Sequence, residues 1–277
     1  MEKLSAQHVE VSYSDQKIID DMNIEIPSGI VTSIIGPNGC GKSTILKAMS
    51  RILTPKKGTV YLNGKSIHQM KTKEVAKEMA ILAQTPDIPQ NLTVTQLVSF
   101  GRHPHRKGTG RLSKIDKEAV TKALEDTGMI EFRDRSLDAL SGGQRQRAWI
   151  AMALAQETEV LLLDEPTTYL DMAHQLEVLE LMQKLNEKKK CTIVMVLHDL
   201  NLAARFSDHL IAMKAGAVQH VGPPSEVMSK NVLRRVFGVE ALIVQDPQTG
   251  KPICMTYNLV NSKASTVERM EKPVRWG

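Results

Sequence analysis

The sequence predicts an α/β fold with a mainly parallel sheet core, an N-terminal antiparallel β-subdomain and an inserted α-helical subdomain. Three observations support this prediction: apolar runs that each end in a chemically competent residue, alternating residues before the first run, and helical periodicity in mid-chain. Strand–helix–strand alternation with apolar strands is typical of a parallel sheet covered on both faces. The 277 residues, 42% of them hydrophobic, can bury a sizeable core.

The N-terminal part is expected to be β-structure. Apolar and polar residues alternate over 4–35, interrupted by a turn at 27–29, and the segment ends in the apolar run 30–35. A helix at 43–51 and a short strand at 59–62 are expected next.

Helical periodicity dominates between about 85 and 156, which predicts a helical subdomain at about 86–156 inserted into the core. Gly128 is suited to end its second helix. The expected helices of this part are 93–100, 113–127 and 144–156. The core is expected to resume with a strand at 160–163, a helix at 173–189 and a strand at 192–197.

Signals weaken beyond about residue 215. We expect one domain over 1–240 and a small extension over 241–277. Within the extension, a turn at 247–250 predicts a hairpin of 241–244 with 252–257, and 262–277 is expected to be a loose tail. No internal repeat is visible.

Composition excludes several functional classes. No apolar run is long enough for a membrane span, and the N-terminus lacks a signal-peptide pattern, so a cytoplasmic chain is expected. Cys40, Cys191 and Cys254 are odd in number and far apart, so reduced thiols are expected rather than disulfides or a metal site. The net charge of +5 is spread without interleaved aromatic residues, and no nucleic-acid partner is expected.

Two basic stretches remain. The lysine run 188–190 is interpreted as a solvated helix face, whereas 102–111 is either a solvated loop or a site close to anionic lipid.

One glycine-rich segment follows the apolar run 30–35 and fits the P-loop pattern GxxxxGK[ST]. In this pattern the glycines let backbone N–H groups turn inward, Lys42 reaches the β- and γ-phosphates, and the Ser43 hydroxyl ligates Mg²⁺. The segment is Gly36-Pro37-Asn38-Gly39-Cys40-Gly41-Lys42-Ser43-Thr44.

A second glycine-rich segment also begins a helix. Ser141 is expected to be the N-cap and Gln144 its capping-box partner, which leaves the amides of Gly142 and Gly143 at the positive end of the helix. One nucleotide does not normally need two such sites. The simplest interpretation is that they serve two ATP molecules, each site being completed by a second copy of a similar domain.

Three predicted strands lead into polar residues that should converge, because ligands bind at the carboxyl ends of strands in such sheets. Asp164 is suited to position Mg²⁺ and Glu165 to orient or deprotonate the attacking water. His198 is expected to hydrogen-bond the γ-phosphate, and Gln84 to reach Mg²⁺ or the water. The same residues could instead be a capping pair at Asp164 and Glu165, a structural histidine, and a surface glutamine.

Taken together, the motifs resemble the nucleotide-binding subunit of ABC transporters over roughly 9–222. The resemblance implies ATP and Mg²⁺ as cofactors and a head-to-tail dimer, in which Ser141 and Gly143 of one subunit face the γ-phosphate held by Lys42 of the other. It also implies a general base at Glu165 and an adenine-stacking ring at Tyr13. The remaining correspondences are Walker A at 36–44, the Q-loop Gln84, the signature 140–144, Walker B at 160–164, the D-loop 169–171 with Asp171, and the switch His198.

Finer features resemble the iron(III)–siderophore importers of the ferrichrome, ferric citrate and enterobactin types, namely the segments 100–105, 164–175 and 198–205. This implies ATP-driven uptake at the cytoplasmic face of the membrane, with a siderophore-type permease and, indirectly, a substrate-binding lipoprotein as partners. Haem and cobalamin importers share many of these features. Soluble ABC ATPases acting on nucleic acid or ribosomes also share the nucleotide-binding motifs, and P-loop kinases and GTPases share the first of them.

Two expectations concern single residues. The helical subdomain docks the permease in this family, so charge reversal at Arg102 or Arg106 is expected to weaken uptake more than ATP binding. Cys40 lies at a helix N-terminus, which predicts a lowered thiol pKa and alkylation that bound ATP prevents.

Overall fold

The computed structural model describes residues 2–14, 16–84, 91–106 and 111–260. Its centre is a six-stranded sheet of order β10-β9-β3-β8-β7-β6, in which only the edge pair β9–β10 is antiparallel. This confirms the predicted, mainly parallel core. Its strands are β3 (Val31–Ile35), β6 (Met79–Leu82), β7 (Val160–Asp164), β8 (Thr192–Val196), β9 (His209–Lys214) and β10 (Ala217–Gly222).

The central strands are apolar because both faces of the sheet are covered. Every residue of β3, β7 and β8 is buried. Ile35 and Leu163 pack into one hydrophobic cluster with the helical part of the chain, whereas Ile34 and Leu162 pack into another with the N-terminal strands. Alternate side chains of one strand therefore join two cores.

A second, antiparallel sheet of order β2-β1-β4-β5 confirms the predicted N-terminal β-subdomain. Exposed and buried residues alternate along much of β2, as expected for a sheet with one face in the core. The buried side of α1 (Lys42–Met49) packs into the same cluster. The strands are β1 (Glu2–Tyr13), β2 (Gln16–Pro27), β4 (Lys57–Leu62) and β5 (Lys65–Ser66).

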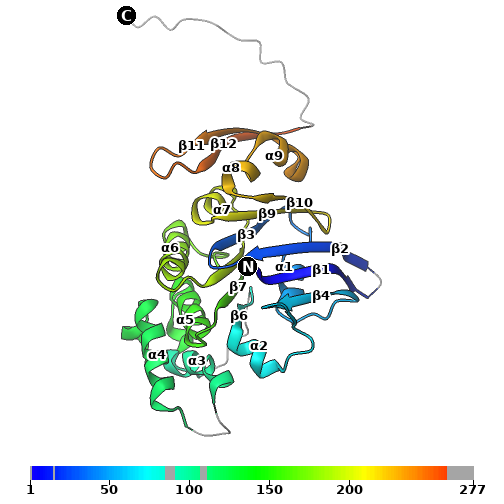
Figure 1. Ribbon diagram of the computed structural model, residues 1–277. Coiled ribbons are helices and arrows are strands. Elements are labelled where there is room, and N and C mark those ends of the chain that lie inside the picture. The colour runs from blue at the N-terminus through cyan, green and yellow to red at the C-terminus, as the bar shows by residue number, and fades with distance from the viewer. Residues whose placement is uncertain (1, 15, 85–90, 107–110, 261–277) are drawn as a thin grey trace, which may run out of the picture.

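Three helices form the predicted helical subdomain: α3 (Val94–Phe100), α4 (Lys114–Asp126) and α5 (Gly142–Ala155). Each begins with a capping box, at Thr93, Ser113 and Ser141 respectively. They pack on one another at one end of the molecule, opposite the hairpin β11 (Val239–Gln245) and β12 (Pro252–Leu259) (Figure 1).

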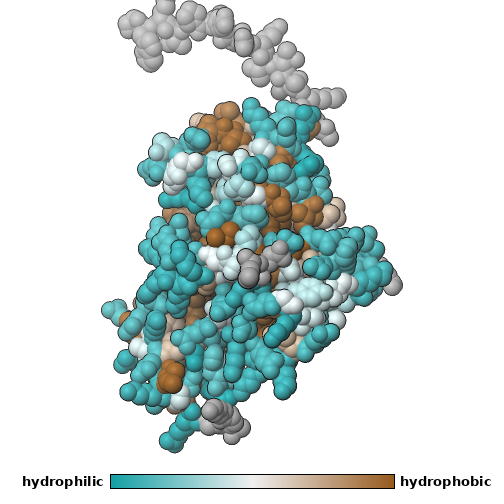
Figure 2. Space-filling view, in the orientation of Figure 1, coloured by the Kyte–Doolittle hydropathy of each residue, from teal (hydrophilic) through white to brown (hydrophobic). Residues whose placement is uncertain are grey.

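Other elements complete the described chain. The sequence predicts α6 (Met172–Lys189) but not α2 (Thr72–Glu78), α7 (Leu200–Phe206), α8 (Pro224–Val227) or α9 (Lys230–Phe237). Apolar side chains gather on the surface of the hairpin (Figure 2), where Leu242 and Met255 are exposed. The expected tail 262–277 and Lys107 of the basic stretch lie outside the described residues. Among the helices described, none has the length and hydropathy to span a membrane.

Arg102 is a buried ion-pair residue. Its Nε donates to Asp116 Oδ1 (2.9 Å) and its Nη1 to Glu157 Oε2 (2.8 Å) and the carbonyl of Ala155 (2.7 Å). The residue is 3% exposed. The interpretation of Arg102 as solvated or lipid-facing is therefore wrong, because these bonds join η1 (His103–His105) to α4 and to the end of α5. The expected effect of charge reversal at Arg102 or Arg106 on uptake stays a prediction.

Arg102→Ala is expected to lower the free energy of unfolding by about 3–5 kcal/mol, since it leaves a buried carboxylate without its cation. The measurement is denaturant unfolding at neutral pH. Arg111→Ala, at an exposed position of the same basic stretch, is the control and should change stability by less than about 0.5 kcal/mol. Equal stability of the two variants would contradict the structural role.

The same network contributes pH-dependent stability. The hydrogen bond from Ser113, reinforced by that from Arg102, lowers the pKa of Asp116 from 3.8 to about 2. Because the folded pKa lies below the unfolded one, this stabilisation is complete above the unfolded value and is lost as the pH falls towards 2.

Candidate functional site

The carboxyl ends of β3, β7 and β8 meet at one edge of the sheet. Ile34 of β3 is opposite Val196 of β8, which is opposite Asp164 of β7. The chain leaves β3 through the glycine-rich loop, β7 into Glu165, and β8 through Leu197 into His198. The predicted convergence of the three strand ends is confirmed.

The glycine-rich loop passes so close to β9 that only glycine fits at its start. A Cβ on Gly36, whose φ is 156°, would lie 2.3 Å from the Met213 carbonyl oxygen. The buried Lys42 extends back over the loop, where its Nζ donates to the carbonyls of Gly36 (2.9 Å) and Pro37 (3.1 Å). A lysine has three N–H donors, so one is left for a phosphate oxygen.

Ser43 and Asp164 form an oxygen pair suited to a magnesium ion. The Ser43 hydroxyl donates to Asp164 Oδ1 (2.7 Å), whereas Asp164 Oδ2 is buried and has no hydrogen-bond partner in the described part of the chain. Burial raises the pKa of Asp164, opposed by the hydrogen bond from Ser43. Hydroxyl and carboxylate oxygens are the ligands Mg²⁺ prefers, and a cation here would satisfy the unpaired oxygen.

The carboxylate of Glu165 is held by three side chains from different parts of the chain. His198 Nε2 lies 2.5 Å from Oε1, Gln84 donates its amide N–H to Oε2, and the Thr168 hydroxyl donates to Oε2 from 3.1 Å. Glu165 itself has a left-handed φ of 52°, an unusual conformation for a residue other than glycine. The interpretation of Asp164 and Glu165 as a capping pair is wrong, because the next helix, α6, begins at Met172 with Asp171 as its N-cap.

A hollow of about 900 Å³ opens at this edge of the sheet. Sequence analysis assigned no role in the site to three of its lining residues, Ile18, Thr168 and Phe237, and assigned Tyr169 only to the D-loop. Tyr13 is half-exposed at the end of β1 and does not line this hollow, and its contact with adenine stays a prediction. The predicted residues that do line it are Gly36, Pro37, Asn38, Gly39, Gly41, Lys42, Ser43, Thr44, Gln84, Glu165 and His198.

The second glycine-rich segment lies outside this hollow. Its capping box is confirmed, since Ser141 Oγ accepts from the Gln144 N–H (3.3 Å) and Gln144 Oε1 accepts from the Ser141 N–H (3.1 Å). Neither 141–144 nor Asp171 is among the lining residues. One chain therefore carries two sets of predicted site residues that its own fold does not bring together.

Large apolar side chains are exposed beside Asp171. Tyr169 is 86% and Met172 79% exposed. Tyr169 also lines the hollow, so its exposed ring lies between the hollow and the start of α6.

The predicted lowering of the Cys40 thiol pKa is wrong. The thiol is buried at 4% exposure, and burial raises its pKa despite the nearby charge of Lys42. The helix N-terminus does not compensate for the loss of water around a thiolate. Cys191 and Cys254 are also buried, and burial raises the pKa of both thiols.

We expect Cys40 to resist iodoacetamide at about pH 7.5, because little thiolate forms there. Mass spectrometry of the digested protein would measure labelling at each cysteine, with the denatured chain as control. Rapid labelling of native Cys40 that ATP suppresses would show that its pKa is lowered after all.

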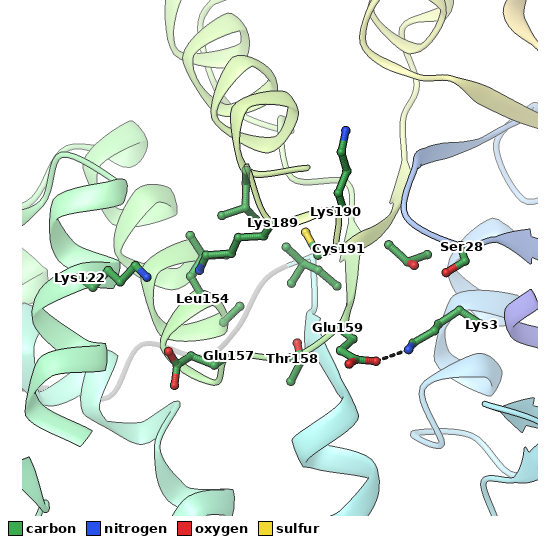
Figure 3. A pocket seen from close by; sticks show the side chains of 14 residues that line it. Lys3, Ser28, Lys122, Leu154, Glu157, Thr158, Glu159, Lys189, Lys190 and Cys191 are labelled. Carbon is green, nitrogen blue, oxygen red and sulfur yellow. Dashed lines mark hydrogen bonds and ion pairs between the residues drawn. The ribbon is translucent and has the colours of Figure 1, made fainter. Parts of the chain in front are cut away.

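Another hollow, of about 390 Å³, lies near the start of the strands β7 and β8 (Figure 3). Its charges are partly satisfied within the chain, because Lys3 pairs with Glu159, and Glu157 with Arg102. It lacks a glycine-rich loop, so the nucleotide is expected at the edge that carries Lys42.

The ABC transporter family model matches residues 19–168. The iron(3+)-hydroxamate import ATP-binding protein FhuC of Bacillus subtilis is 57% identical over 96% of this chain and 99% of its own. The petrobactin import ATP-binding protein FpuD of Bacillus anthracis is 50% identical over 92% of this chain and 93% of its own. A solved dimeric bacterial ABC transporter cassette, MJ0796, is 28% identical over 79% of this chain and 98% of its own, with a TM-score of 0.71.

Proposed function

The chain belongs to the ABC transporter ATPase family, and from this premise we propose that it powers the uptake of iron(III)–siderophore complexes. The observation that carries the ATPase assignment is the contact of Glu165 with Gln84 and His198 beside the glycine-rich loop. The substrate class is supported by relatives whose names specify iron(3+)-hydroxamate and petrobactin import.

Each residue of the proposed site has a separate role. Lys42 and the loop amides bind the phosphates, and Glu165 accepts a proton from the attacking water. Ser43, Asp164 and Gln84 would hold Mg²⁺, which supplies positive charge that stabilises the phosphate oxygens. His198 is suited to contact the γ-phosphate, and Tyr13 is proposed to stack on the adenine.

We further propose a head-to-tail homodimer. The separation of 141–144 and Asp171 from the hollow of their own chain supports it, as do the exposed Tyr169 and Met172 and the dimeric state of the MJ0796 cassette. Ser141, Gly142, Gly143 and Gln144 of one subunit would then face the nucleotide bound by the other. A permease at the cytoplasmic face of the membrane, served by a lipoprotein, would complete the importer.

The test is uptake of radioactive iron as a ferric hydroxamate in cells from which this gene is deleted. Wild-type protein should restore uptake and Lys42→Ala should not, while haem and cobalamin uptake stay constant throughout. Loss of haem or cobalamin uptake with normal hydroxamate uptake would assign the subunit to a different importer.

A further inference from the structure

We infer that His174 is a positioning residue that locks together the two parts of a subunit that reach the partner's nucleotide. These parts are the start of α5, residues 141–144, and the loop that ends at Asp171. The inference rests on the proposed head-to-tail dimer and assigns a role to a side chain outside the motifs that define the nucleotide site.

The imidazole of His174 lies directly against the backbone of Gly143. A Cβ added to Gly143 would be 2.4 Å from His174 Cδ2 and 2.9 Å from Cγ, whereas one added to Gly142 would meet nothing within 4 Å. Gly143 is buried and Gly142 exposed. The ring therefore occupies the place that any larger residue at 143 would need, and fixes the distance between α5 and α6.

The same ring holds Asp171. Its Nδ1 lies 2.7 Å from Asp171 Oδ1, which also accepts from the backbone N–H of His174 (2.9 Å). These bonds lower the pKa of Asp171, the backbone bond more than that from the ring. The Asp171 side chain is thus a charged acceptor held in one orientation.

Further contacts make this junction stiff. One turn along both helices, Arg147 of α5 pairs with Glu177 of α6 at 3.6 Å. Gln175, next to His174, donates to the carbonyl of Leu170 (3.0 Å). The ring contact adds to these bonds at the point where the helix start meets the loop; without the ring, the Arg147–Glu177 pair is left to join α5 to α6 here.

Loss of the His174 ring should affect closure of the dimer but leave nucleotide binding within a chain unchanged. None of the described contacts of His174 reaches Lys42, Ser43 or Glu165. A subunit without the ring should bind ATP normally but present its partner with a poorly ordered surface.

The experiment compares His174→Ala with its parent, both carrying Glu165→Gln so that bound ATP is retained. Affinity for a fluorescent ATP analogue is measured at protein concentrations too low for association, and ATP-driven dimerisation by analytical ultracentrifugation. His174→Ala should weaken dimerisation about tenfold or more, since it removes a hydrogen bond to a charged group, and leave ATP affinity unchanged. His174→Asn, which can still donate to Asp171, should recover part of the loss.

His8→Ala is the matched control, because His8 also bonds an aspartate, Asp21, at 2.7 Å but lies exposed on β1. It should change neither quantity. A second comparison introduces Gly143→Ala with and without His174. If the ring is what excludes a side chain at 143, Gly143→Ala should weaken dimerisation less in the His174→Ala background.

Four outcomes would overturn the inference. If His174→Ala weakened ATP binding as much as it weakened dimerisation, His174 would belong to the nucleotide site of its own chain. Unchanged dimerisation, or an identical penalty for Gly143→Ala in both backgrounds, would show that the contact does not couple the two parts. A Glu165→Gln parent that stays monomeric with ATP would refute the proposed dimer, and with it this role of His174.

Discussion

Glu165→Gln is expected to slow ATP hydrolysis by a factor of about 10²–10⁴, the usual contribution of a general base. Glutamine has nearly the same shape as glutamate, and its one amide oxygen can still accept from either His198 or Thr168, which now contact different oxygens of the carboxylate. It cannot take a proton from water. ATP should therefore bind and remain unhydrolysed, as measured by phosphate release alongside nucleotide-binding titrations.

Glu159→Gln provides the control for this variant. Glu159 is an exposed carboxylate paired with Lys3 beside the other hollow, so its loss should leave hydrolysis at the wild-type rate. Hydrolysis at the wild-type rate in Glu165→Gln would remove Glu165 from the role of base. Loss of ATP binding in that variant would show instead that the carboxylate supports the loop around Lys42.

The convergence of residues at the candidate nucleotide site was largely predictable because these residues follow strands that are predominantly apolar. In β3, β7 and β8 both faces are covered, so the strands have no polar residue at an exposed face and their ends are easily located. Parallel pairing then places Lys42, Glu165 and His198 at one edge. The first step needs only the local sequence, and the second only the rule that ligands bind at the carboxyl ends of the strands in such sheets.

What could not be predicted depends on burial by distant segments. The sequence around Arg102 indicates exposure, yet α4 and α5 enclose this side chain. The sequence around Cys40 indicates a reactive thiol, yet Cys40 packs into the hydrophobic cluster of the N-terminal strands. Ile18 and Phe237 line the hollow without a motif. The short elements α2 and α8 contain too few turns to show periodicity.

The contact between His174 and Gly143 also depends on segments that are distant in the sequence. Nothing in the order of residues relates 143 to 174, and only the packing of α5 on α6 brings them together. A buried glycine in a helix commonly marks close approach by a neighbour, but the burial of Gly143 is visible only in the structure.

If two subunits share each site, a prediction follows that does not depend on the chemical role of any single residue. Lys42→Ala should lower hydrolysis about 100-fold or more, because it removes a buried donor to the phosphates. Ser141→Arg should do the same from the other side, by placing a long cation at the exposed start of α5. Each variant alone forms dimers with two defective sites.

Mixing the two variants should restore activity above that of either alone. In the mixed dimer, the Lys42 of one chain faces the Ser141 of the other, so one site contains neither substitution. In a second mixture, a chain that carries both substitutions is combined with the wild-type chain. Each site of the mixed dimer then contains one defect, and the activity per mixed dimer should vanish. Phosphate release as a function of mixing ratio separates the two arrangements. If each site were instead built within a single chain, the second mixture would be the more active of the two. Its wild-type chains would stay fully active, whereas the mixture of Lys42→Ala with Ser141→Arg would gain nothing.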